Sequence, residues 1–156
     1  MEFHKVLVPV DFSPCSLEAY HAAVTLARQF KAELLILHVI DNRILESLTK
    51  ASPLKGDALM KGLHTKARLR LRSFLSEHPS EVKLRRIIVP GVPFHEIVRM
   101  ARLEQVDLIV MGRYGGTGEL EKIFFGSTAE KVVRVAPCAV LTIPQIGRER
   151  KSAEKG

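Results

Sequence analysis

Several features that mark large classes of protein are missing from this sequence. No apolar run approaches the ~18 residues that a membrane-spanning helix needs. The first residues, MEFHKVLVPVDFS, lack the charged start, apolar stretch and small-residue cleavage site of a signal peptide. Only two of the 156 residues are cysteine. These absences are typical of a protein of the reducing cytoplasm, and the length predicts one domain with a full core.

Patterns of common catalytic and metal sites are missing too. Neither a Ser-His-Asp order nor a G-x-S-x-G turn indicates a hydrolase. His38, inside an expected strand, is interpreted as a core residue, and Cys15 has no second cysteine close in sequence for redox chemistry. No catalytic residue is therefore predicted. The histidines and cysteines show no spacing of metal ligands; they are His4, His21, His38, His64, His78, His95, Cys15 and Cys138.

Two widespread phosphate-binding loops are also absent. A Walker loop ends in Gly-Lys-Ser or Gly-Lys-Thr, and neither sequence occurs. A dinucleotide fingerprint, G-x-G-x-x-G, follows a first strand. Here Gly116-Thr-Gly118 follows the fourth expected strand, and Glu121 stands where the third glycine should be.

Positive charge is concentrated in one segment. The net charge is +7, and residues 61–86 hold eight Lys and Arg against two Glu. Such a segment could meet nucleic acid or an acidic partner. A solvated helix face is the favoured interpretation, because no aromatic residues interleave with the cations for base stacking.

Apolar runs and helical stripes alternate along the chain. Runs rich in Val, Ile and Leu predict buried parallel strands at 5–10, 33–39, 82–89, 106–112 and 138–143. Apolar residues at three- and four-residue steps predict helices at 14–30, 57–77, 93–104 and 128–135. This order predicts an open α/β sheet with right-handed crossovers and helices on both faces.

Two segments carry no such pattern. Residues 42–58 are expected to form a long loop or a broken helix start, because polarity is mixed and a proline and a glycine fall within them. The last residues, 147–156, are expected to be a disordered tail after a single domain over residues 1–146.

Glycines gather after the fourth expected strand. Gly112, Gly115, Gly116 and Gly118 fall within seven residues, and Gly126 precedes Ser127. Ligands of open parallel sheets bind at the carboxyl ends of the strands, where this cluster lies. Successive glycines let backbone N–H groups form an anion-binding concavity, and a helix starting at 126–128 adds its dipole.

The two ends of this stretch resemble a motif of the universal stress protein family. Its nucleotide-binding members carry G-x2-G-x9-G-[ST], to which Gly112-Arg-Tyr-Gly115 and Gly126-Ser127 are similar. Residues 5–27, 91–101 and 126–144 resemble further family segments, and the resemblance covers residues 3–144. Ten residues, not nine, separate Gly115 from Gly126, which makes Gly116 a candidate for the second glycine position.

The resemblance implies a Rossmann-like, adenine nucleotide alpha hydrolase-like sheet of order 3-2-1-4-5 that binds ATP or AMP, with Mg2+ beside the phosphates. Asp11 would contact a ribose hydroxyl or Mg2+, and the Val39 backbone would pair with adenine. A homodimer through the last strand (138–144) and an unknown regulatory protein partner are also implied, with no membrane contact. The implied site consists of Pro9, Val10, Asp11, Phe12, Ser13, Val39, Gly91, Met111, Gly112, Arg113, Gly115, Gly116, Gly126, Ser127 and Thr128.

Structural roles compete with these assignments. Ser127-Thr-Ala-Glu130 matches a capping box, Ser13-Pro14 a helix start, and Asp11 a loop cap. Three functions follow: a nucleotide-dependent regulatory homodimer of the stress response with at most slow ATP hydrolysis, a nucleotide-free interaction module favoured by the longer loop, and a nucleic-acid binder using residues 61–86. The first is the leading hypothesis.

Overall fold

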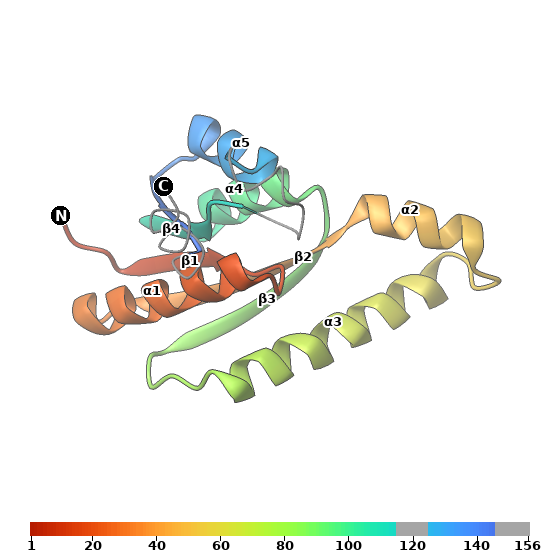
Figure 1. Cartoon of the computed structure of the whole chain (residues 1–156), viewed down its shortest axis with the longest axis horizontal. Helices are drawn as coiled ribbons and strands as arrows, with labels where there is room; N and C mark the ends of the chain where they lie inside the picture. Colours follow the sequence, from red (N-terminus) through yellow and green to blue (C-terminus); the bar gives the residue numbers. More distant parts are fainter. Residues whose placement is uncertain (115–124, 146–156) are drawn as a thin grey trace, which may run out of the picture.

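Five parallel strands form one sheet in the order β3-β2-β1-β4-β5 (Figure 1). The computed structural model describes residues 1–114 and 125–145. The predicted order and the alternation of strands and helices are confirmed. Gly115, Gly116 and the expected tail at 147–156 lie outside the described residues. The strands are β1 (Lys5–Pro9), β2 (Glu33–Asp41), β3 (Leu84–Gly91), β4 (Leu108–Gly112) and β5 (Ala139–Ile143).

Alternation along the strands divides the core into two layers. Val6 and Val8 of β1 face a cluster with α1 (Pro14–Phe30) and α3 (Asp57–Glu77). Leu7, between them, faces a cluster with α4 (Pro93–Leu103) and α5 (Ser127–Val135). Successive side chains of a strand point to opposite faces, so the continuous apolar runs supply both layers. Figure 1 shows α1 and α3 on one side of the sheet and α4 and α5 on the other.

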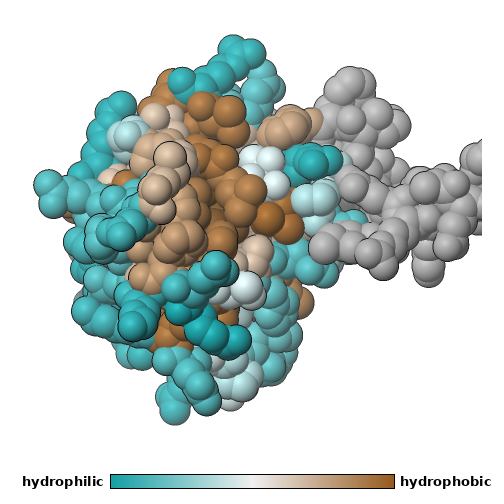
Figure 2. Space-filling view, turned by 90° about the vertical axis from the view of Figure 1, so that its left-hand side faces the viewer, coloured by the Kyte–Doolittle hydropathy of each residue, from teal (hydrophilic) through white to brown (hydrophobic). Residues whose placement is uncertain are grey.

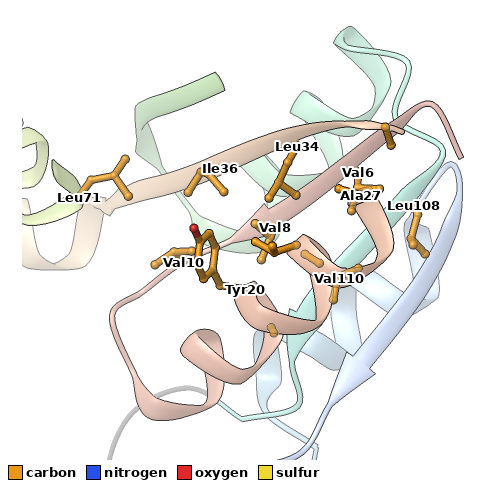
Figure 3. Packing of buried hydrophobic residues seen from close by; sticks show 14 residues of the cluster. Val6, Val8, Val10, Tyr20, Ala27, Leu34, Ile36, Leu71, Leu108 and Val110 are labelled. Carbon is orange, nitrogen blue, oxygen red and sulfur yellow. The ribbon is translucent and has the colours of Figure 1, made fainter. Parts of the chain in front are cut away.

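The layer beneath α1 is filled by strand side chains and one buried tyrosine. Figure 3 shows Val8 and Val10 beside the ring of Tyr20, which is 1% exposed. The Tyr20 hydroxyl donates a hydrogen bond of 2.7 Å to the carbonyl oxygen of His78, just after α3. This bond satisfies the polar tip of the tyrosine and ties α1 to the end of α3.

The segment expected to be a loop contains a helix. Residues 42–51 form α2 (Asn42–Ala51), and the Asp41 side chain accepts a hydrogen bond of 2.9 Å from the Arg43 backbone N–H. A long loop was therefore wrong for residues 42–51, where this cap at the end of β2 was missed, whereas a helix that breaks before α3 agrees with the alternative of a broken helix start. None of the α2 residues, all of them described, is buried, and Figure 1 shows the helix projecting from the sheet ahead of α3.

The two predicted serine caps have different outcomes. Ser13 caps α1 as expected: its Oγ accepts a hydrogen bond from the Ser16 N–H at 3.2 Å, and Pro14 follows it. The capping box at Ser127 is absent, because Gly126 occupies the cap position and Ser127 is already the first helical residue. Glu130 instead pairs with Arg134 at 2.8 Å.

Candidate functional site

A cavity of about 800 Å3 lies at the carboxyl ends of the central strands. Its floor comes from residues 9–12, 37–41 and 111–112, which end β1, β2 and β4. Residues 126–129, at the start of α5, contribute on one side. Parallel sheets place ligand sites in such crevices outside the strand ends. The cavity is therefore the candidate binding site.

The loop after β1 forms part of this cavity. The Val10 N–H donates to the Leu37 carbonyl oxygen at 2.8 Å, which continues the sheet one residue beyond β1. Phe12 then adopts a left-handed backbone with φ 65°. Its ring lies 4.7 Å from the His38 ring and 5.8 Å from the Phe74 ring, measured between centroids. Aromatic packing on both sides thus holds a backbone conformation that a bulky residue rarely adopts.

Asp11 has one carboxylate oxygen engaged and one available. Oδ1 accepts a hydrogen bond of 2.9 Å from the Ser13 N–H, the loop cap that competed with a ligand role in the sequence. Oδ2 accepts none from the described residues, and Asp11 lines the cavity. The loop role and a ligand role are therefore compatible in one side chain.

His38 lines the cavity, although its position in a strand predicted a core residue. Its Nδ1 lies 2.7 Å from the Val10 carbonyl oxygen, and since a carbonyl only accepts, Nδ1 carries the hydrogen. Burial lowers the pKa of His38; the bond to Val10 opposes this effect, while the charge of Arg70 adds to it. His38 is thus favoured as a neutral imidazole at the ends of β1 and β2.

Gly112, the first glycine of the cluster, packs closely against Cys15. A Cβ at this position would lie 3.0 Å from the Cys15 Sγ and 3.1 Å from the Cys15 backbone carbon. The next residue, Arg113, bonds through its N–H to Ile143 O and through its carbonyl oxygen to the Gly126 N–H, both at 2.9 Å. The two ends of the glycine-rich stretch are thereby held against each other beside the cavity.

The cavity gathers most, but not all, of the residues that sequence reasoning assigned to a site. Ser13, Gly91 and Arg113 do not line it. Ser13 caps α1, and Gly91 has a φ of 151° and leaves room for Glu96, whose Cγ would lie 2.5 Å from an added Cβ. The guanidinium carbon of Arg113 lies 5.8 Å from the Phe125 ring centroid. The lining set is Pro9, Val10, Asp11, Phe12, Val39, Met111, Gly112, Gly126, Ser127 and Thr128; their contact with a nucleotide stays a prediction.

One wall of the cavity was missed in the sequence. Arg43 and Ile44 of α2, with Leu63, Lys66 and Arg70 of α3, contribute to it. The signal was the spacing of 63, 66 and 70, which puts these side chains on one face of a helix. The basic segment therefore divides: Arg85 pairs with Glu104 near the start of β3, whereas Lys66 and Arg70 reach the cavity.

Comparison with known proteins identifies the family. The model of the universal stress protein family matches residues 2–144. The chain belongs to the universal stress protein family. Universal stress protein MJ0531 of Methanocaldococcus jannaschii is 35% identical, and the match covers 94% of this chain and 85% of that one.

Solved structures of the family share the fold. MJ0577 of the same organism superposes with a TM-score of 0.72 at 32% identity, covering 92% of this chain and 97% of that one. UspA from Lactobacillus plantarum gives 0.67 at 31% identity, covering 92% and 99%. A universal stress protein solved in complex with cAMP gives 0.60 at 22% identity, covering 93% and 99%, which shows the fold alone.

The described residues contain neither a cluster of metal ligands nor a membrane-spanning helix. No group of three or more His, Cys, Asp or Glu among residues 1–114 and 125–145 could hold a metal ion by itself. A Mg2+ ion beside Asp11 would therefore take further ligands from phosphate oxygens and water. No described helix is long and apolar enough to cross a membrane.

Proposed function

We propose that this universal stress protein binds ATP or AMP in the cavity at the strand ends and acts as a nucleotide-dependent regulator of the cytoplasmic stress response. The observation that carries the proposal is the meeting of Asp11 and the first turn of α5 in one cavity. Asp11 offers a carboxylate oxygen to a ribose hydroxyl, while α5 offers backbone N–H groups to phosphate.

The start of α5 suits phosphate for two reasons. Ser127, Thr128 and Ala129 begin the helix, and N–H groups of a first turn have no acceptor inside the helix. The helix dipole adds partial positive charge at the same place. Gly126 donates its own N–H to Arg113 and so fixes the entry of the chain into this turn.

Adenine is assigned to the end of β2. Residues 37–41 line the cavity there, and the side chains of Leu37 and Val39 are packed in the layer with α4 and α5. Backbone groups of Val39 would pair with the edge of the base. This arrangement resembles many cofactor sites, in which apolar walls and a few polar groups fix the ligand.

Binding is proposed as the activity, with hydrolysis slow at most. The lining carboxylates lie at the ends of strands, because Asp11 follows β1 and Asp41 is the last residue of β2, whereas the start of α5 contributes no acidic side chain to the lining. Asp41 is held by Arg43 in an ion pair of 2.5 Å, which lowers the pKa of its carboxyl. No described lining group thus stands at the phosphate end as an evident general base.

A homodimer through β5 is the second part of the proposal. β5 is an edge strand of five residues, and edge strands pair readily with a copy of themselves. Leu141 of β5 and Val133 and Val135 of α5 are 39%, 50% and 46% exposed. Figure 2 shows that one side of the molecule carries a band of hydrophobic residues bordered by hydrophilic ones. Apolar surface of this kind favours association.

Titration calorimetry with Mg-ATP and with AMP tests the nucleotide site. We expect a dissociation constant near 10 μM, which is about −7 kcal/mol, and a loss of about ten-fold or more in Asp11→Asn. Glu81→Gln removes an exposed charge far from the lining set and should bind as the wild type does. The absence of any binding signal up to millimolar nucleotide would contradict the proposal and favour the nucleotide-free interaction module.

A further inference from the structure

The nucleotide cavity has a second cationic side. Lys66 and Arg70 lie one helical turn apart on α3 and both line the cavity. α3 packs on the sheet face that also carries α1, whereas α5 packs on the opposite face (Figure 1). The two cations and the first turn of α5 therefore approach the cavity from opposite sides of the sheet.

Arg70 is held in place without being neutralised. Its guanidinium carbon lies 4.5 Å from the centroid of the Phe12 ring, and Phe12 is itself packed between His38 and Phe74. A guanidinium over an aromatic face keeps its N–H donors around its rim for a planar acceptor such as phosphate. Phe12 and His38, whose rings are in contact, both line the cavity with Arg70, and the charge of Arg70 helps to lower the pKa of His38.

Some other described arginines are neutralised by a carboxylate. Arg99 pairs with Glu96 and Arg134 with Glu130, both at 2.8 Å, and Arg43 pairs with Asp41. Neither Lys66 nor Arg70 forms an ion pair with a carboxylate of the described residues. Two uncompensated cations in a cavity wall favour an anionic ligand group.

The size of the cavity leaves room for such a group. At about 800 Å3 it lies toward the upper end of the roughly 300–1,000 Å3 found for small-molecule sites. Asp11, the proposed ribose contact, directly precedes Phe12, on which Arg70 rests. With the nucleotide placed as proposed above, its ribose side would face the cations and its 5′-phosphates would face α5.

We propose that Lys66 and Arg70 bind a second phosphate group on the ribose side, so that the cavity prefers adenine nucleotides with phosphate on both sides of the nucleoside. The inference rests on the proposed function. Two sources share this chemistry: a nucleotide with its second phosphate on the 3′ hydroxyl of the ribose, and one with that phosphate on the 2′ hydroxyl. In either case a mononucleotide with 5′-phosphates alone leaves the two cations unused.

Calorimetry with three ligands tests the preference at constant salt. AMP, adenosine 3′,5′-bisphosphate and adenosine 2′,5′-bisphosphate are titrated into the wild type, Lys66→Gln/Arg70→Gln and Arg68→Gln/Arg72→Gln. The last variant loses the same charge from α3 at residues outside the lining set. We expect the wild type to bind one of the two bisphosphates at least about ten-fold more tightly than AMP, the effect of a charge-assisted contact.

The variants separate the possible results. In Lys66→Gln/Arg70→Gln the ratio of bisphosphate affinity to AMP affinity should fall close to one, whereas Arg68→Gln/Arg72→Gln should keep the wild-type ratio. Equal loss in the two variants would mean general charge attraction and would overturn the inference, as would a wild type without preference. If no binding of AMP could be measured, the proposed function itself would be contradicted. The preferred ligand, the 3′,5′- or the 2′,5′-bisphosphate, identifies the ribose hydroxyl that carries the second phosphate.

Discussion

The Nδ1 atom of His38 donates a hydrogen bond of 2.7 Å to the carbonyl oxygen of Val10. The bond joins the end of β2 to the loop that follows β1, at the floor of the candidate site. Neutral imidazole can make it while remaining partly buried, and burial lowers the pKa of His38 below the ordinary value of 6.5. Folding of this region therefore favours the neutral ring.

Stability should fall in acid because of this histidine. A folded pKa below the unfolded one means that the unfolded chain takes up the proton first. The contribution of His38 is thus fully present above pH 6.5 and is lost as the pH falls below that value. Urea unfolding between pH 5 and 7.5 should show a smaller pH dependence in His38→Asn than in the wild type. An unchanged slope in His38→Asn would refute the assignment.

Gly112→Ala should destabilise the fold. The added Cβ would lie 3.0 Å from the Cys15 Sγ and 3.1 Å from the Cys15 backbone carbon, so α1 and β4 must separate slightly. We expect a loss of about 1–3 kcal/mol in the free energy of unfolding, typical of overpacking. Urea unfolding at pH 7.5 measures it.

Gly62→Ala is the matched control for that change. An added Cβ at Gly62 meets nothing within 4 Å, and the residue lies inside α3. Alanine should there raise stability by up to about 1 kcal/mol through helix propensity. Cys15→Ala should restore only part of the loss at Gly112, because the backbone contact remains. Full restoration would show that the sulfur alone sets the distance.

Much of the fold could be predicted because its signals are local. Apolar runs marked all five strands, and stripes marked α1 and α3 with the bounds that the structure has. The bounds of α2 were not predicted because none of its residues is buried, so no stripe of core residues marks this helix in the sequence. The start of α5 was placed one residue late because Gly126, without a side chain, takes the cap position that the Ser127 pattern favoured.

The site was predictable where strands end and where the glycine-rich stretch enters α5. Residues 9–12 and 111–112 lie at the ends of apolar runs, so the topology alone brings them to one edge, and residues 126–128 were assigned from the motif. Lys66 and Arg70 were not predicted because their place depends on how α3 lies across the sheet after a long connection. The pairing of His38 with Val10 likewise depends on the register of β2 against β1, which joins Pro9 to Leu37.

Ser127→Glu should separate stability from binding. Ser127 is exposed, begins α5 and lines the cavity. A carboxylate in the first turn interacts favourably with the positive end of the helix dipole, so the free energy of unfolding should rise by about 0.3–1 kcal/mol. The same charge repels phosphate, so ATP affinity should fall about ten-fold or more, and AMP affinity less. Calorimetry and urea unfolding measure the two effects.

Ser127→Gln is the control for side-chain size in that experiment. Glutamine has the shape of glutamate without its charge, so ATP affinity should stay close to that of the wild type. An equal loss in Ser127→Gln and Ser127→Glu would indicate steric obstruction and would leave the charge argument without support.

Leu141→Lys should shift the proposed homodimer toward monomer. Leu141 is 39% exposed on the edge strand β5, and a lysine there would place like charges together at a two-fold interface. Sedimentation velocity at several protein concentrations should show a dimer dissociation constant at least about ten-fold weaker than that of the wild type. Leu69→Lys changes an equally apolar residue that is 62% exposed on α3, and it should leave the dimer intact. A wild type that sediments as a monomer at every concentration would contradict the homodimer. Equal weakening by both variants would place the interface outside β5.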